Sequence, residues 1–218
     1  MIREADQPIE FLGQNLILLP EKALFWVQKK TLILSDLHLG KSGHFQKHGI
    51  AVPTTVNLNN IARLEQLAKA FNPDTIIFVG DLFHSDMNSE WSDFINWRAS
   101  NSEIRMFLVI GNHDFYPPEN YESIGLQCVH QLASPPFLFI HELPDTESET
   151  PNYPICGHIH PSVRLKGKGR QSVRVSCFYF GEYHAILPAF GSFTGTSTLK
   201  PKKGDKVFAL VQGEILEI

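Results

Sequence analysis

Five short apolar runs, each followed by an Asp, Asn or His, constrain the fold of this chain more than any other feature of its sequence. The runs are Thr31–Ser35, Thr75–Val79, Ile104–Ile110, Phe137–Ile140 and Pro154–Cys156. Several are continuously apolar rather than alternating, which predicts strands that are buried on both faces. The carboxyl ends of strands in an open α/β sheet gather ligands at one edge. The sequence therefore predicts one polar site at that edge.

The stretches between these runs indicate how the strands connect. Thr54–Phe71 carries apolar residues at helical spacing and stops at Asn72-Pro73, and Trp91–Ser100 is a shorter predicted helix. The further predicted strands are Asn15–Leu19, Ala23–Val27, Ser172–Phe180, His184–Leu187 and Val207–Val211. Strand and helix alternate in the first half, whereas the second half is mostly strands and turns. We therefore expect residues 1–218 to form a single α/β domain with two sheets.

Composition and charge exclude several classes of protein. The 218 residues include 19 Lys and Arg against 23 Asp and Glu, and the formal net charge of −4 excludes a uniformly basic nucleic-acid-binding protein. The three cysteines form no CxxC pair, which fits a reducing compartment rather than a disulfide framework. The first residues lack the pattern of a signal peptide, and no apolar stretch approaches membrane-spanning length. We expect a cytoplasmic protein with no membrane partner.

The polar residues at the five strand ends form a set typical of metal ligands. They are Asp36, His38, Asp81, Asn112, His141, His158 and His160. Residues i and i+2 of an extended segment point the same way, so Asp36 and His38 can reach one centre together. Mixed oxygen and nitrogen donors suit Mn, Fe, Zn or Ni better than Mg. Seven ligands are too many for one ion and suit a pair of ions about 3.5–4 Å apart that clamps a phosphoryl group.

Several of these residues also have a purely structural interpretation. Asp36 and His38, taken alone, are typical of a capped turn beside a surface histidine. His141 is placed only by its position after an apolar strand. Asp114 is expected to be a turn residue or to orient an imidazole, as carboxylates behind metal ligands often do.

The order of the motifs resembles a known superfamily. DLH, GDLFH, GNHD, a lone His after an apolar strand, and GHIH follow one another between residues 36 and 160. This series resembles the calcineurin-like metallophosphoesterase superfamily. The resemblance implies a four-layer α/β/β/α sandwich, in which two mixed sheets pack face to face and helices lie outside them.

The same resemblance implies a role for each ligand. One metal would be held by Asp36, His38 and His160. The other would be held by Asn112, His141 and His158. Asp81 would bridge the two metals, and His113 would neutralise the phosphate or protonate the leaving group.

Longer strings resemble narrower groups within the superfamily. GDLFHS places His84 where many members carry an acidic residue or Asn. SDLHLG together with GDLFH resembles the repair-nuclease branch that includes SbcD-type enzymes, in which the second His supports the catalytic one; otherwise His84 is a loop histidine. SDLHLGKSGHFQKHGIAVP and LPAFGSFTGT resemble the ligase-associated DNA-damage-response endonuclease family, PdeM. That resemblance implies a link with a DNA ligase and a helicase.

The expected reaction is hydrolysis of a phosphodiester by a hydroxide that bridges two divalent transition-metal ions, with DNA as the first substrate class. Mn is the expected metal, and Fe, Zn or Ni are the alternatives. A small-molecule phosphodiesterase or phosphomonoesterase is the second hypothesis, because the chain is short and net negative. A non-catalytic scaffold on the same fold is the third, although such a scaffold is expected to lose ligands and none is missing here.

Two further segments are candidates for substrate contact. Between Val163 and Phe180 the chain has five basic residues and no acidic one, which predicts either a path for a phosphate-rich substrate or a solvated hairpin. The five are Arg164, Lys166, Lys168, Arg170 and Arg174. His44 and His48 lie in a stretch with Gly on both sides, which predicts a loop near the substrate rather than a third metal site.

Overall fold

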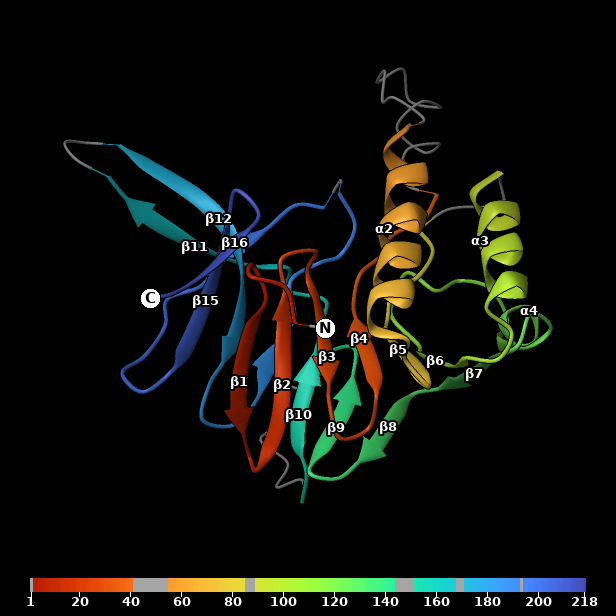
Figure 1. The fold of residues 1–218 in the computed structure, drawn as a ribbon, viewed down its shortest axis with the longest axis horizontal. Helices are drawn as coiled ribbons and strands as arrows, with labels where there is room; N and C mark the ends of the chain where they lie inside the picture. Colours follow the sequence, from red (N-terminus) through yellow and green to blue (C-terminus); the bar gives the residue numbers. More distant parts are fainter. Residues whose placement is uncertain (1, 41–54, 85–88, 144–150, 168–170, 193) are drawn as a thin grey trace.

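The computed structural model describes residues 2–40, 55–84, 89–143, 151–167, 171–192 and 194–218, and Figure 1 shows their arrangement. The first sheet has seven strands in the order β1-β2-β3-β4-β5-β6-β7. Their bounds are Gln7–Phe11 (β1), Gln14–Leu19 (β2), Ala23–Trp26 (β3), Thr31–Leu34 (β4), Thr75–Val79 (β5), Arg105–Val109 (β6) and Leu126–Val129 (β7). Neighbours pair antiparallel from β1 to β4 and parallel from β4 to β7. The carboxyl ends of β4, β5 and β6 therefore lie at one edge.

The second sheet has nine strands, of which seven follow the order β14-β11-β12-β13-β10-β9-β8, while β15 pairs with β12 and β16 with β15. Their bounds are Gln131–Ser134 (β8), Phe137–Ile140 (β9), Tyr153–Cys156 (β10), Pro161–Lys166 (β11), Ser172–Phe180 (β12), Ala185–Ile186 (β13), Ser197–Thr198 (β14), Lys206–Val211 (β15) and Glu214–Glu217 (β16). β10 pairs parallel with both β9 and β13. The carboxyl ends of β9 and β10 thus point the same way.

Two hydrophobic layers hold the sheets in place. The inner faces of the two sheets pack together, with Leu24 and Ile33 of the first sheet in one buried cluster with Phe137 and Phe178 of the second. The other face of the first sheet is covered by helices, whose bounds are Thr55–Phe71 (α2), Ser89–Ser100 (α3) and Pro118–Glu122 (α4). Burial of these apolar side chains is the main source of stability in such a sandwich. The expected α/β fold with two mixed sheets is therefore confirmed.

The resemblance implied helices outside both sheets. All the helices within the described residues lie over the outer face of the seven-stranded sheet (Figure 1). On the outer face of the nine-stranded sheet, a small buried cluster around Leu138 and Ile186 is covered by loop side chains such as Leu143 and Leu199. None of the helices in the described part of the chain has the length and apolar character needed to cross a membrane.

The predicted strands and helices match the observed ones to within a residue or two, and the differences have a physical cause. The sequence prediction omitted β1, β7, β8, β11, β14, β16 and α4. β1 and β16 lie at sheet edges and carry alternating or mostly exposed residues, so neither contains a continuous apolar run. β11 contains Arg164 and Lys166, which are exposed. Such strands form because they pair with neighbouring strands, and their own sequence of apolar and polar residues gives little indication of them.

Candidate metal centre

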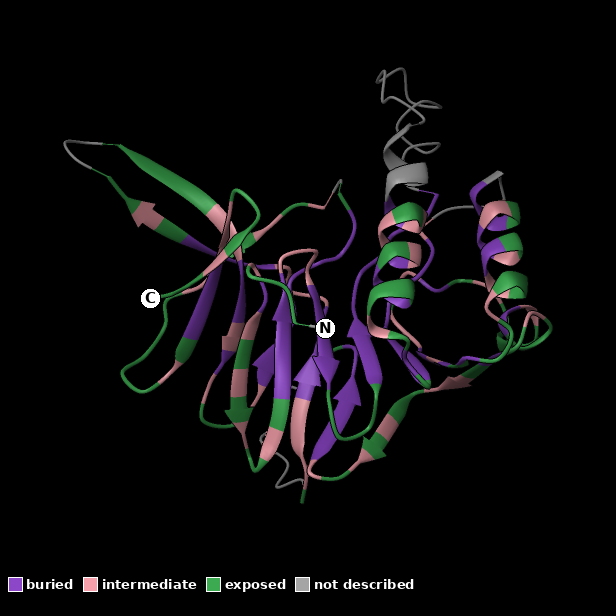
Figure 2. Cartoon of the chain, in the orientation of Figure 1, coloured by how far each residue is buried: buried purple, intermediate pink, exposed green. Residues whose placement is uncertain are grey.

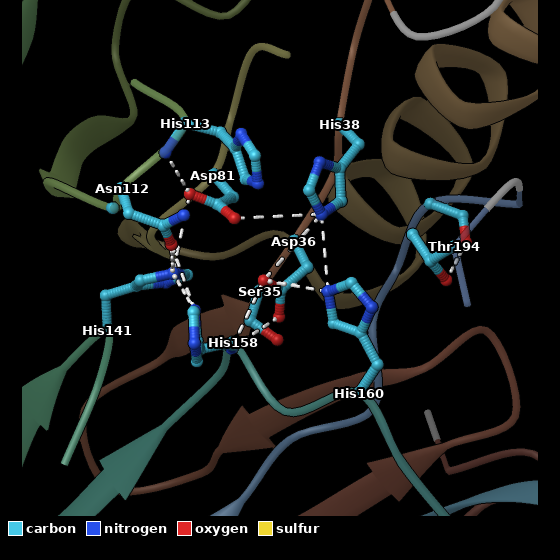
Figure 3. Close-up of polar contacts among 12 residues, drawn as sticks. Ser35, Asp36, His38, Asp81, Asn112, His113, His141, His158, His160 and Thr194 are labelled. Atoms are coloured by element: carbon cyan, nitrogen blue, oxygen red, sulfur yellow. Dashed lines mark hydrogen bonds and ion pairs between the residues drawn. The ribbon is translucent and has the colours of Figure 1, made fainter. Parts of the chain in front are cut away.

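Five strand ends from both sheets meet at one edge of the sandwich and bring the seven predicted ligands together. Asp36 and His38 follow β4, Asp81 follows β5, Asn112 follows β6, His141 follows β9, and His158 and His160 follow β10. Figure 3 shows the seven side chains pointing toward one another. The strand-end rule explains the grouping within each sheet, because each turn after a parallel strand opens at the same edge. The face-to-face packing of the two sheets then brings the two groups together.

One cluster consists of Asp36, His38 and His160, whose ligand atoms all lie within 4.8 Å of one another. The Nε2 atoms of His38 and His160 are 3.3 Å apart. The Asp36 Oδ1 atom lies 3.2 Å from His160 Nε2 and 4.0 Å from His38 Nε2. Asp36 and His38 are buried and His160 is partly exposed, so this cluster reaches the surface through His160.

A second cluster contains Asp81, His141 and His158, with ligand atoms again within 4.8 Å of one another. The Oδ1 atom of Asn112 belongs to the same group, at 3.0 Å from His141 Nε2 and 2.9 Å from His158 Nδ1. These two ring nitrogens are 3.3 Å apart. The geometry therefore brings together the amide oxygen and the two imidazoles that the sequence analysis assigned to one ion.

Asp81 faces both clusters. Its Oδ1 atom lies 3.4 Å from His141 Nε2, and its Oδ2 atom lies 3.8 Å from His38 Nε2. Oδ1 also accepts the backbone N–H of His113 at 2.8 Å. Burial raises the pKa of the Asp81 carboxyl, while His141 acts in the opposite direction. One carboxylate with an oxygen toward each cluster has the position that a bridging ligand needs.

The hydrogen bonds behind the imidazoles fit a cation in each cluster. His141 Nδ1 is 3.1 Å from the Val79 carbonyl oxygen, and His160 Nδ1 is 3.0 Å from that of Gly195. A carbonyl can only accept, so Nδ1 carries the proton and a neutral imidazole turns its Nε2 lone pair inward. Those lone pairs face the oxygens of Asn112 and Asp36. A positive ion stabilises such facing acceptors, and mixed nitrogen and oxygen donors suit a divalent transition metal.

The backbone at the centre is strained. Asp36, His38, Asp81, His158 and His160 all have a positive φ, between 49° and 65°. This left-handed region is uncommon for residues other than glycine, although Asp, Asn and His tolerate it best. Strain of this kind persists only where the surrounding structure over-determines it, and it is concentrated at functional sites.

Glycines next to the ligands make room for side chains from the neighbouring strand. A Cβ atom at Gly80 would overlap the ring of His141, and Gly80 also has a positive φ of 77°. A Cβ atom at Gly157 would lie 2.6 Å from Asp36 Oδ2. Asp114 was expected to be a turn residue or to orient an imidazole. Its carboxylate accepts backbone N–H groups, including those of Asp81 and Gly111, and contacts no imidazole among the described residues, so the first alternative is the one observed.

His113 and His84 form a third group beside the clusters. Their rings stack with centroids 4.2 Å apart, and the His38 ring centroid lies 5.6 Å from that of His113. The Nδ1 atom of His113 is buried and has no hydrogen-bond partner among the described residues. The structure thus places His84 against His113, where it can orient that ring. His44 and His48, predicted to form a loop near the substrate, lie outside the described residues.

Sequence reasoning missed the groups that orient the imidazoles. Glu142 Oε1 lies 3.4 Å from His158 Nε2, on the outer side of that ring. The Gly195 carbonyl holds His160 from a distant part of the chain. Gly195 belongs to the string LPAFGSFTGT, which supported the family resemblance but did not indicate that Gly195 contacts a metal ligand. Glu142 directly follows His141 in an acidic stretch, and its sequence context does not distinguish it from an ordinary solvent-exposed carboxylate.

Two mixed sheets packed face to face, with clustered His and Asp at their shared strand ends, define a metal-dependent hydrolase of phosphoric esters. The sequence profile of the calcineurin-like phosphoesterases matches residues 29–181, and the chain belongs to that family. The nuclease MPE of Pseudomonas putida has a similar structure, with a TM-score of 0.82 and 28% identity over 98% of this chain and 100% of that one. YfcE, a phosphoesterase from E. coli, gives a TM-score of 0.42 and 14% identity over 86% of this chain and 97% of that one.

One curated relative also matches by sequence. The Danio rerio transmembrane protein with metallophosphoesterase domain is 25% identical over 107 residues. These residues are 46% of this chain but only 22% of the relative, so the chain spans less than two thirds of that protein.

Proposed function

We propose that this chain hydrolyses phosphodiester bonds of DNA and acts as a nuclease in DNA repair. The observation that carries the proposal is the pair of ligand clusters that share Asp81. The likeness to a nuclease over essentially the whole of both chains supports the substrate class.

Seven residues would hold two divalent ions, with Mn as the proposed metal. Asp36, His38 and His160 would hold one, and Asn112, His141 and His158 the other, with Asp81 between them. When bound, such a pair of ions neutralises phosphoryl oxygens and lowers the pKa of water toward neutrality. The left-handed backbone at five of these residues fixes their side chains before substrate arrives, so little reorganisation is needed during the reaction.

His113 would act directly on the substrate. Its backbone N–H donates to the carboxylate of Asp81, so the ring is held at the edge of the two clusters. There the imidazole would neutralise the phosphate or donate a proton to the leaving oxygen, and the stacked ring of His84 would keep it in that orientation.

A substrate panel tests the proposal. The metal-loaded protein should cleave single-stranded or duplex DNA in Mn, and the cleavage should disappear in Asp81→Asn and fall by at least about a hundredfold in His113→Ala. Turnover confined to bis(p-nitrophenyl) phosphate, p-nitrophenyl phosphate or cyclic nucleotides would instead establish the small-molecule phosphoesterase. No bound metal and no turnover of any ester in added Mn would establish the non-catalytic scaffold.

The repair role extends the proposal to partners. The strings that resemble the ligase-associated endonuclease family support a functional link with a DNA ligase and a helicase. Reconstitution with purified ligase and a nicked, damaged duplex tests that link. Joined product should increase when this chain is added and should not increase with Asp81→Asn.

A further inference from the structure

A β-hairpin projects from the body of the protein directly beside the candidate metal centre. It consists of β11 and β12 and is called the β11–β12 arm below. The two strands pair antiparallel from Ser162 opposite Ser176 to Lys166 opposite Ser172, and the Gly167 N–H donates to the Gln171 carbonyl near the tip. Figure 1 shows the arm, which continues the nine-stranded sheet, projecting away from the rest of the protein, and Figure 2 shows that its outer half is exposed.

The arm carries uncompensated positive charge. Arg164 lies directly opposite Arg174, Lys166 is two residues farther along the same strand, and all three are exposed. Their side chains make no hydrogen bond or ion pair with any residue that the structure describes. Residues 161–180 contain no Asp or Glu at all. Like charges directly opposite each other on a sheet are destabilising, so this pairing is not explained by the stability of the hairpin.

The two faces of the arm have opposite character. Side chains alternate along a strand, so Arg164, Lys166 and Arg174 share one face, which we call the basic face. Val163, Leu165 and Val175 lie on the other face, in a hydrophobic cluster with Val207 and Ala209 of β15. The apolar face therefore anchors the arm to the sheet and leaves the basic face directed to solvent in a fixed orientation.

The β11–β12 arm is adjacent in the chain to a residue of the candidate metal centre. His160 is followed at once by Pro161, the first residue of β11. The His160 carbonyl also accepts the N–H of Ser197, so the junction is tied to β14. A strand rises about 3.3 Å per residue, which places Arg164 about 13 Å and Lys166 about 20 Å along β11 from His160. Phosphates of one strand in a DNA duplex follow one another at about 3.4 Å along the axis, so these distances correspond to about four and six nucleotides.

We propose that the basic face of the β11–β12 arm binds the sugar–phosphate backbone of DNA, several nucleotides from the phosphodiester held at the metal centre. This inference rests on the proposed function, because it extends the substrate of the same centre. A net charge of −4 is no obstacle, since the positive charge is concentrated on one projecting face.

Salt-dependent binding tests the inference. The variant is Arg164→Gln/Lys166→Gln/Arg174→Gln. The matched control is Lys29→Gln/Lys30→Gln/Arg105→Gln, which removes the same charge from three exposed residues at the opposite ends of the first sheet's strands. Binding of a fluorescein-labelled 30-base-pair duplex is followed by anisotropy between 50 and 200 mM NaCl. The slope of log K against log salt should fall in magnitude by about 2–3 in the arm variant, at about 0.9 for each lost phosphate contact. The control should keep the slope of the unmodified protein, and an unchanged slope in the arm variant would overturn the inference.

Turnover separates this inference from the proposed function. The arm variant should lose kcat/KM on the 30-base-pair duplex but keep its turnover of bis(p-nitrophenyl) phosphate, which cannot reach the arm. An equal loss on the small ester would overturn the inference, because the arm would then act through the metal centre. If the unmodified protein turns over the ester but neither binds nor cleaves DNA, the proposed function fails and the inference fails with it. If it cleaves DNA and the arm variant binds and cleaves equally well, the inference alone fails.

Discussion

The carboxylate of Asp114 accepts the backbone N–H of Asp81 at 2.9 Å, although the two residues are 33 positions apart in the chain. The same carboxylate accepts the N–H groups of Gly111 and Leu82 at 2.9 Å and of Phe83 at 3.3 Å. Asp114 is buried, which raises the pKa of its carboxyl to about 6 despite the opposing effect of these hydrogen bonds. One side chain thus joins the turn after β5 to the turn after β6.

Removal of this carboxylate should therefore destabilise the fold. Asp114→Ala leaves four backbone N–H groups without their acceptor, so we expect the free energy of unfolding to fall by about 3–5 kcal/mol. Urea unfolding of the metal-free protein measures this change. Asp74→Ala is the control, since Asp74 is exposed, and it should change stability by no more than about 0.5 kcal/mol. Equal effects of the two substitutions would contradict the proposed role of Asp114.

Metal stoichiometry should separate the two clusters. The intact protein should retain about two Mn ions per chain, and His160→Ala and His141→Ala should each retain about one. Asp81→Asn should retain less than either, because its two oxygens face different clusters. Elemental analysis after dialysis measures the bound metal. His130→Ala, an exposed histidine, is the control and should keep both ions. Two ions retained in both single-cluster variants would refute the ligand assignment.

His113 should matter most for poor leaving groups. His113→Ala should lower kcat on DNA by about 10²- to 10⁴-fold, because the leaving alkoxide needs a proton. The loss should be smaller on bis(p-nitrophenyl) phosphate, whose leaving group is a weak base. His84→Ala should give an intermediate loss, since His84 acts only through the ring that it stacks on.

Two controls make the His113 measurement specific. Metal content should stay unchanged in both variants, because neither ring belongs to a ligand cluster. His184→Ala, a partly buried histidine that contacts Tyr179 in the second sheet, should leave kcat unchanged. A similar loss on both substrates would exclude proton donation by His113.

The convergence of the site was predictable from sequence because it follows from a rule about strand ends. β4, β5, β9 and β10 were each recognised by a continuous apolar run, and parallel pairing within each sheet brings the polar residues after its strands to one edge. That the two edges meet depends on how the two sheets pack together. His141 was predicted to be a ligand only from its position after an apolar strand, and its Nε2 atom lies 3.0 Å from Asn112 Oδ1. Which ion these side chains bind stays a prediction.

The parts that were not predictable depend on contacts between distant segments. Asp114 could not be assigned its partners, since they are backbone groups that reach it only after folding. The left-handed backbone at Asp36 and His160 has no glycine to indicate it. The edge strand β1 was not predicted because its five residues contain no continuous apolar run and none of them is fully buried. In each case the tertiary structure overrides a weak local signal.

The close approach of Gly80 to His141 leads to a final prediction. Gly80→Ala introduces a Cβ atom that would overlap the His141 ring, at a residue whose φ is 77°. We expect the ring to be displaced, so the second cluster should lose its metal and DNA cleavage should fall at least tenfold. Gly204→Ala is the matched control, because Gly204 also has a positive φ, of 101°, but no atom within 4 Å of the added Cβ. Both substitutions strain the backbone by about 1–2 kcal/mol, so only the overlap distinguishes them. Metal content measured at equal fractions of folded protein should fall for Gly80→Ala alone, and equal loss in both variants would show that strain rather than overlap is responsible.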